Sequence, residues 1–368
     1  MRGGPVTVGV EEEYQLVDPD TRALVGVAPR IVLRAEALDL DVKEELHSSQ
    51  IEIGTRVCTN LAELRSEIAA ARRSVSVMAA ARGARPVAGG THPFSRWEHQ
   101  PVTDSPRYEE LEESYRQIVR ETVIFGSHVH VGIDDPEVLI GVMNRARLWI
   151  PVLIAVAANS PFWGASDTGY ASFRAEIARR WPQSDLPHHF HSRAEYDKLI
   201  DDLVAGGSVP DASQIYWDIR PSMRYDTLEF RATDVPPSID ETVMVAGLVR
   251  ALAVVCLDEI QRGTAAPTPR PELLQAAKWR AGRDGLRGEL IDARTARAKP
   301  APELVWDLLE HVRPALEHLG DLNEVCSLVA DTLSRGNGAD RQRAVYERTG
   351  SFEDVVDALA AETCAGVA

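Results

Sequence analysis

Four short segments of the chain alternate apolar and polar residues in a way that suits a β-strand. They lie in the first two thirds of the 368 residues and have the sequences VTVGVEEEYQL, SSQIEIGT, FGSHVHVGI and TLEFRAT. Successive side chains of a strand point to opposite faces, so each segment has one apolar face and one polar face. These strands come without regular alternation with helices, which favours an α+β fold over a parallel α/β sheet or barrel.

The polar faces carry residue types that bind metal ions or anions. In the first segment Glu11 and Glu13 share a face, while Glu12 is on the side of the valines. We expect Glu12 to pair with an arginine of a helical layer or to lie at a solvated rim. The other segments repeat the scheme with Gln50 and Glu52, with His128 and His130, and with Glu229 and Arg231.

Two interpretations of these polar faces stand. An antiparallel sheet with one face in water would alternate in the same way. Solvated strands usually carry Thr, Lys and Ser, however, whereas Glu, His and Arg are typical of binding sites. If the sheet curves, carboxylates meet in one cavity, where two of them about 5 Å apart repel by ~3 kcal/mol at an effective dielectric constant of about 20. A carboxylate-rich set suits Mg²⁺ (or Mn²⁺) better than Zn²⁺, so we expect such an ion there.

Helical periodicity fills most of the remaining chain, whereas the first 60 residues predict strands and loops. Pro-rich stretches at residues 265–272 and 298–302 are expected to connect helices. The segments beyond them are small and amphipathic, so we expect one domain over residues 1–368 with a mostly helical C-terminal third. The predicted helices start at Asn60, at Ser105 with Pro106 (to about Val123), at Asp134 or Asp135 with Pro136 (including residues 148–158), and at Ser238 with Glu241 (ending at Gly263).

The net charge and the number of cysteines restrict which binding partners and which cellular compartment we expect. The chain has 40 Lys and Arg against 56 Asp and Glu, a formal net charge of -16, which disfavours nucleic acid and anionic membranes. A nucleotide such as ATP stays compatible, because arginines or cations can reverse the field within one pocket. The longest apolar run has 11 residues, too few to span a membrane. Four scattered cysteines indicate reduced thiols and a cytoplasmic protein.

Common nucleotide-binding and hydrolytic motifs are absent from the sequence, which has no GxxxxGK[ST], no GxGxxG after a strand, no HExxH and no GxSxG. If ATP binds, metal ions and arginines must therefore hold its phosphates in place of a glycine loop. Arginine suits this task because its planar guanidinium binds phosphate or carboxylate with two hydrogen bonds.

Five motifs in order resemble one enzyme family. The chain contains GVEEEYQLVDP, EELHSSQIEIGT, GSHVHVGI, ANSPFWGASDTGYASFR and DTLEFRATD, and its C-terminal GADRQRAVYERTGSFEDVVDALAAET is also similar. Together they resemble the carboxylate-amine ligase family known as glutamate-cysteine ligase type 2. This resemblance implies a curved antiparallel sheet of about six strands that forms a funnel wrapped by helices, as in glutamine synthetase, and ATP-dependent amide formation with ADP as product.

The resemblance also implies roles for particular residues. Arg231, His128 and Glu52 would be catalytic, and Arg174, Arg220 and His130 would contact the nucleotide or the acidic substrate. Glu45 and Glu52 are seven residues apart, so a bulge or loop must intervene if both reach one site. Relatives often have an arginine where this chain has Ser166, which leaves the substrate open. The implied metal ligands are Glu11, Glu13, Glu45, Glu52 and Glu229.

We therefore expect a ligase that activates a small-molecule carboxylate as an acyl phosphate and joins it to an amine. Glutamate and cysteine are the family default, and another amino acid or amine is an open alternative. Histidines spaced as HxH near acids also occur in metal-dependent amidohydrolases, which gives a rival function. A catalytically silent, nucleotide-binding relative is the third hypothesis. A homodimer is compatible with the sequence.

Overall fold

One antiparallel sheet forms the centre of the molecule. A computed structural model describes residues 6–38 and 40–367 of the chain. Six strands follow the order β10-β11-β5-β1-β3-β2, and a seventh, β4, also pairs with β1. All these pairings are antiparallel, which confirms the predicted α+β fold. The strands are β1 (Val8–Val17), β2 (Val42–Glu44), β3 (Gln50–Gly54), β4 (Arg85–Val87), β5 (Gly126–Gly132), β10 (Ile219–Pro221) and β11 (Thr227–Asp234).

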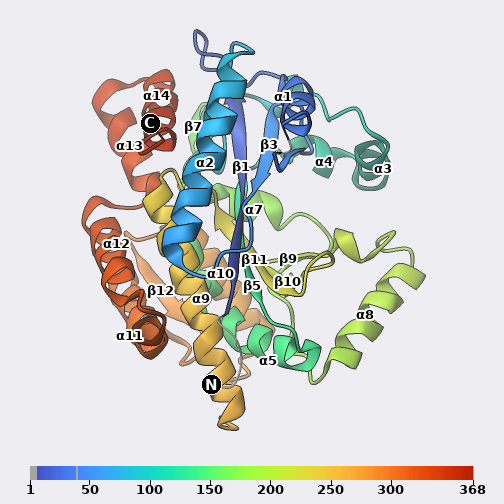
Figure 1. Cartoon of the computed structure of the whole chain (residues 1–368), viewed down its shortest axis with the longest axis vertical. Helices are drawn as coiled ribbons and strands as arrows, with labels where there is room; N and C mark the ends of the chain where they lie inside the picture. The colour runs from blue at the N-terminus through green and yellow to red at the C-terminus, as the bar shows by residue number, and fades with distance from the viewer. Residues whose placement is uncertain (1–5, 39, 368) are drawn as a thin grey trace.

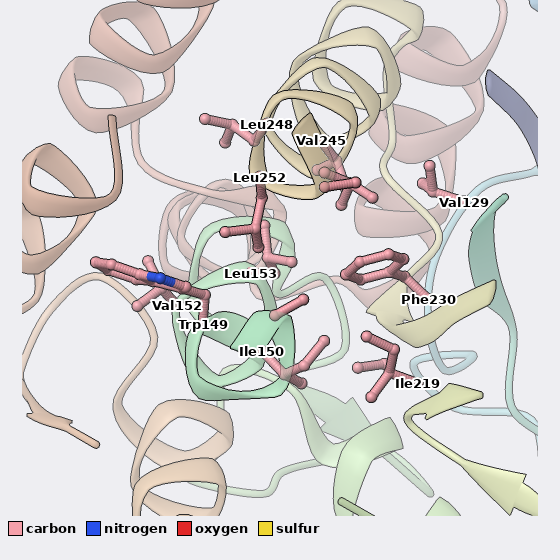
Figure 2. Packing of buried hydrophobic residues seen from close by; sticks show 14 of the residues in the cluster. Val129, Trp149, Ile150, Val152, Leu153, Ile219, Phe230, Val245, Leu248 and Leu252 are labelled. Carbon is pink, nitrogen blue, oxygen red and sulfur yellow. The ribbon is translucent and has the colours of Figure 1, made fainter. Parts of the chain in front are cut away.

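The apolar face of this sheet packs against helices. The long helices α2 (Leu61–Ala80) and α9 (Ile239–Gln261) lie across the sheet in Figure 1, and α6 (Ile150–Ala157) packs on β11. Figure 2 shows Phe230 of β11 on the side of the cluster toward the sheet, facing Leu153 of α6 and Val245 of α9. Burying this face leaves the opposite, polar face of the strands free to line a cavity.

Most predicted helix starts are confirmed by their caps. Asn60, Asp135 and Ser238 each accept a hydrogen bond from a backbone N–H in the first turn of the following helix. The helix that begins after Ser238 ends just before Gly263, which has a positive φ of 68°. Residues 262–270 connect α9 to α10 (Pro271–Asp284), so the Pro-rich stretch at 265–272 is a connector as expected, and its last two residues begin α10.

Three expectations about secondary structure are wrong. The first 60 residues contain a helix, α1 (Ala28–Glu36), which no side chain caps and which is held by burial of its apolar face. The helix predicted to run from Pro106 to about Val123 breaks at Arg116, where φ is 53°. Residues 298–302 are not a simple connector, because β13 (Arg297–Pro300) pairs with β12 (Glu289–Asp292) before the next helix begins.

The most apolar helical segment is part of the core. Residues 136–157 comprise α5 (Pro136–Ala146), a 3-10 turn (Arg147–Trp149) and α6, and are long and apolar enough to cross a membrane. Their most apolar window is 83% buried inside the fold, so the segment acts as a core element. All four cysteines are free thiols in the described chain.

The remaining elements surround the sheet. Helices α11 and α12 pack on α9, and α14 packs on β4 near the C-terminus (Figure 1). These elements are α3 (Pro106–Tyr115), α4 (Gln117–Glu121), α7 (Phe173–Ala178), α8 (Arg193–Ala205), α11 (Ala301–Leu319), α12 (Leu322–Arg335), α13 (Gly338–Thr349), α14 (Phe352–Thr363), β6 (Phe162–Trp163), β7 (Ser166–Asp167), β8 (Ser184–Asp185) and β9 (Tyr216–Trp217), with 3-10 turns at Trp97–His99 and Ala212–Gln214.

Candidate active site

Cross-strand register gathers the acidic residues on the polar face of the sheet. Glu11 of β1 lies opposite His128 of β5, and Glu13 of β1 lies opposite Glu52 of β3. Residues directly opposite in an antiparallel pair point to the same face, so the four side chains converge. Glu229 of β11 pairs with His130 on one side and with Arg220 of β10 on the other.

These residues line a cavity of about 440 Å³. Side chains from the sheet form one wall, and residues of α3, α7 and the connections around β9 and β10 form the other walls. The structure thus brings all ten predicted site residues to one place: Glu11, Glu13, Glu45, Glu52, His128, His130, Arg174, Arg220, Glu229 and Arg231.

A hairpin explains how Glu45 and Glu52 reach the same cavity. Strand β2 ends at Glu44 and β3 returns beside it, with Lys43 opposite Glu52. Glu45 is two residues beyond Lys43, so alternation keeps it on the face that Lys43 and Glu52 share. In a single straight strand, a spacing of seven residues would put Glu45 and Glu52 on opposite faces. Because the chain reverses between β2 and β3, both side chains face the same side of the sheet.

His128 lies at the centre of the acidic cluster. Its Nδ1 is 3.1 Å from Glu11 Oε2 and 3.8 Å from Glu229 Oε1, and its Nε2 is 3.8 Å from Glu13 Oε1. Burial and the nearby Arg231 lower the pKa of His128, so the imidazole is neutral. Since Nδ1 donates to Glu11, the Nε2 lone pair is left, and among the described residues it has no hydrogen-bond partner.

The carboxylates fall into two electrostatic classes. Burial alone would raise the pKa of Glu11, but hydrogen bonds with His128 and His130 hold that pKa well below its usual range. Burial opposes ionisation of Glu229 too, yet the Arg231 and Arg220 guanidinium groups hold its pKa far below normal. These two groups are ionised even without a bound cation.

Glu45 and Glu52 behave in the opposite way. Burial and then the negative charge of Glu13 raise the pKa of Glu45 to about 7. Burial and then the charges of Glu45, Glu11 and Glu13 raise the pKa of Glu52 well above its usual range. Such crowding indicates that a positive charge belongs among these groups when all of them are ionised.

The donor set fits a divalent cation. One group of ligand atoms comes from Glu11, His128 and Glu229, and another from Glu13, Glu52 and His128. Within each group the atoms lie within 4.8 Å of one another. A buried imidazole nitrogen without a partner beside mainly carboxylate oxygens suits Mg²⁺ or Mn²⁺.

Two arginines, Arg220 and Arg231, bind Glu229, which is one of the clustered carboxylates. Arg220 Nε is 2.8 Å from Glu229 Oε2, and the Arg231 guanidinium donates to the other oxygen. A register shift in the pairing of β11 with β5 falls between Phe230 and Thr233, next to Arg231. A bulge at this point redirects the strand beside the cavity.

Arg174 reaches the cavity from α7 across a glycine. Its guanidinium donates to the carbonyl oxygens of Ala232 and Arg231, both at 3.3 Å. It lies directly over Gly126, where a Cβ would overlap the guanidinium group. The absence of a side chain at residue 126 is therefore what allows Arg174 to lie here.

Glu12 has a structural role on the other face of β1. Its side chain is fully buried, and its Oε1 and Oε2 accept hydrogen bonds from Arg72 of α2 at 2.6 and 3.0 Å. The expectation that it pairs with an arginine of the helical layer is confirmed, and the solvated-rim alternative is wrong.

Sequence comparison decides the family. The profile of Glutamate-cysteine ligase family 2 (GCS2) matches residues 7–358. The chain belongs to this family of ATP-dependent carboxylate-amine ligases. A "Putative glutamate--cysteine ligase 2" of Rhodopirellula baltica is 39% identical over 363 residues, which cover 97% of this chain and 96% of the relative. A protein of the same name from Salinispora arenicola is 42% identical over 360 residues, covering 97% and 95%.

Solved structures support the fold of this GCS2 ligase. A glutamate-cysteine ligase from Francisella tularensis, determined in complex with AMP, matches with a TM-score of 0.72 at 11% identity, covering 99% of this chain and 90% of its own. A bifunctional glutathione synthetase from Pasteurella multocida matches with a TM-score of 0.73 at 15% identity, covering 98% of this chain. This GCS2 chain spans about half (52%) of that bifunctional protein.

Several cavity residues of the GCS2 ligase were missed by sequence reasoning. Lys43 could have been found, because it stands two positions before Glu45 and alternation places both on one face. Arg107 and Tyr108 lie on α3 and Trp181 follows α7, and both helices approach the cavity only through the tertiary fold. No local pattern marks these three residues.

Proposed function

We propose that this protein joins a small-molecule carboxylate to an amine at the expense of ATP, with ADP and phosphate as products. The observation that carries the proposal is the convergence of the five predicted glutamates with the two predicted histidines and the three predicted arginines in one cavity. The GCS2 match is consistent with this chemistry.

The proposed metal ligands are the carboxylates of the cluster. Glu11, Glu13, Glu45, Glu52 and Glu229 would hold Mg²⁺ (or Mn²⁺), and His128 contributes the free Nε2 lone pair. When bound, such ions supply positive charge that neutralises the phosphates of ATP. We assign Glu52 and His128 a direct part in catalysis because both belong to a group of converging ligand atoms.

The arginines and His130 are proposed to bind the anionic substrates. Arg231 is the best candidate for the transferred phosphoryl group or the substrate carboxylate, because it borders the carboxylate cluster from the bulge of β11. Arg174, Arg220 and His130 would contact the nucleotide or the acidic substrate. The AMP complex of the Francisella ligase supports a nucleotide site in a protein of this fold.

The proposed reaction has two transfers. A carboxylate oxygen of the substrate attacks the γ-phosphorus of ATP, the bond to the bridging oxygen breaks, and ADP leaves. The amine nitrogen of the second substrate then attacks the acyl carbon, phosphate leaves, and the nitrogen loses a proton. Residues of the chain hold the substrates in line and keep compensating charge around them.

The same hypothesis extends to the substrates, the domain organisation and the cellular compartment of the protein. Glutamate and cysteine are the proposed default pair, and another amino acid or amine is the open alternative. We propose a single catalytic domain over residues 1–368, acting in the cytoplasm on small molecules, with a homodimer as an open state. The net charge of -16 supports the absence of nucleic-acid and membrane partners.

The test is a turnover assay with defined products. The protein is incubated with Mg²⁺, ATP and a panel of amino acids and amines, and ADP, AMP and condensed products are measured together. We expect ADP formation that depends on one carboxylate and one amine and matches the amide formed. AMP in place of ADP would indicate an acyl adenylate and reject the acyl-phosphate step.

The two rival functions predict different outcomes. An amidohydrolase would cleave amides with Zn²⁺ and without ATP, but the cluster has more carboxylates than imidazoles, which does not favour zinc. A silent relative would bind ATP with Mg²⁺ and turn over no member of the panel.

A further inference from the structure

Lys43 places an ammonium group among the proposed metal ligands. It lies in β2 directly opposite Glu52, which lies opposite Glu13 of β1 in the next pairing. Lys43 Nζ is 3.5 Å from Glu52 Oε1 and 3.9 Å from Glu11 Oε1. It also lies 3.4 Å from Asp41 Oδ1, whose side chain is half exposed.

The two carboxylates that Lys43 contacts belong to different ligand groups. Glu11 is in the group with His128 and Glu229, whereas Glu52 is in the group with Glu13 and His128. Over residues 6–38 and 40–367, Lys43 is the only lysine or arginine that forms an ion pair with Glu11 or Glu52. Arg220 and Arg231 contact Glu229 instead.

We propose that Lys43 is a built-in counter-ion of the metal-free site, which holds Glu11 and Glu52 together and competes with the divalent cation for them. This inference rests on the metal site of the proposed function. Two facts allow the ammonium group to yield to the metal: its side chain is 31% exposed, and Asp41 offers a partner on the solvent side. Lysine also has a flexible four-carbon stem.

If this is correct, Lys43 lowers the affinity of the site for a divalent cation. A metal bound by an oxygen that Lys43 also contacts would lie within about 6 Å of the ammonium group. At that separation, repulsion between a single and a double positive charge weakens binding by about tenfold even with the screening of bulk water. Removing the lysine charge should therefore tighten metal binding.

The experiment compares three variants with the unaltered full chain after removal of metal by a chelator. Lys43→Met removes the charge and keeps the stem, Lys43→Arg keeps the charge, and Lys198→Met removes an exposed lysine of α8 that does not line the cavity. Binding of Mn²⁺ is measured directly by the paramagnetic signal of the free ion. Thermal unfolding is measured for each protein without metal and with saturating Mn²⁺.

We expect Lys43→Met to bind Mn²⁺ about tenfold more tightly or better, to unfold at a lower temperature without metal, and to show a larger upward shift with Mn²⁺. Lys43→Arg and Lys198→Met should resemble the unaltered protein. Unchanged or weaker Mn²⁺ binding by folded Lys43→Met would overturn this inference alone. Absence of Mn²⁺ binding by the unaltered protein would overturn it together with the proposed metal site.

Discussion

Three consecutive glutamates in β1 occupy three different environments. Glu11 faces His128 and Lys43, and Glu13 faces the backbone N–H of Gly126 and the Gln50 amide. Glu12 points to the opposite face and pairs with Arg72, as described above. Alternation along the strand predicts which face each residue takes, but the partners come from distant segments and had to be observed.

Glu11→Gln tests the site with little disturbance of the fold. The amide keeps the size of the side chain but loses a charge that a bound cation needs, so we expect kcat to fall by at least about 100-fold. The free energy of unfolding should fall by only about 1 kcal/mol, because the amide oxygen can still accept the hydrogen bond from His128 Nδ1 while the charge facing Lys43 is lost. Steady-state ADP release and urea unfolding measure the two effects, with exposed Glu109→Gln as control. Full activity would remove Glu11 from the mechanism.

Glu229→Gln should behave differently from Glu11→Gln. Glu229 is buried and neutralises both Arg220 and Arg231. Its loss leaves two buried guanidinium groups without their carboxylate, so activity should fall and stability should drop by roughly 3 kcal/mol. Urea unfolding without metal separates the two variants. Equal stabilities of Glu229→Gln and Glu11→Gln would contradict the pairing described here.

Gly126→Ala tests whether a missing side chain positions Arg174. The new methyl group would displace the guanidinium, so we expect the KM for ATP to rise or kcat to fall by about tenfold or more. Arg174→Ala should cause a loss at least as large. The double variant should be no worse than Arg174→Ala, because the methyl group then has nothing left to displace. Additive losses would show that Gly126 acts through another contact.

At the scale of helices and strands, an element could be predicted from the sequence when its own residues carry a strong capping or alternation pattern. Capped helices such as α2 and α9 and the strands with alternating faces could be predicted from the sequence. Helix α1 could not, because it has no side-chain cap and only nine residues. The approach of α3 to the cavity depends on its packing against α4 and the adjacent elements, which leaves no trace in its own sequence.

The loop after β4 provides a prediction about pH. His92 is buried, its Nδ1 accepts from the backbone N–H groups of Phe94 and Ser95, and its Nε2 lies 2.9 Å from the Arg22 carbonyl oxygen. Burial lowers the pKa of His92 to about 4 from an ordinary value of 6.5. Between these values the unfolded state binds more protons than the folded state, so stability falls as the pH is lowered.

We expect lowering the pH from 7 to 5 to cost about 2 kcal/mol of unfolding free energy through this residue. His92→Asn retains an acceptor near Nδ1 but cannot titrate, so its unfolding free energy should lose that part of the pH dependence. Urea unfolding of both proteins at several pH values, without metal, gives the difference. Parallel pH profiles would show that His92 does not control this slope.

At the scale of the whole molecule, one buried ion pair connects the sheet to three other parts. Arg72 of α2 binds Glu12 of β1 and also donates to the carbonyl oxygens of Pro236, Pro237 and Thr363. These partners lie in the connection from β11 to α9 and at the end of α14. The sequence predicted an arginine partner for Glu12, but a choice among many arginines needed the tertiary structure.

This network should control global stability without contributing to the chemistry. Glu12→Met or Arg72→Met leaves an uncompensated buried charge, and each should cost about 3–5 kcal/mol of unfolding free energy. The double variant should lose less stability than the sum of the two single losses, by about 2 kcal/mol or more, since neither charge is then left alone.

Urea unfolding of the unaltered protein, the two single variants and the double variant gives the coupling energy. The exposed pair Arg270 and Glu272 serves as the control cycle and should show little coupling, because water screens both charges. Additive losses at Glu12 and Arg72 would mean that the carbonyl contacts of Arg72, rather than its pairing with Glu12, hold the C-terminal helix to the sheet.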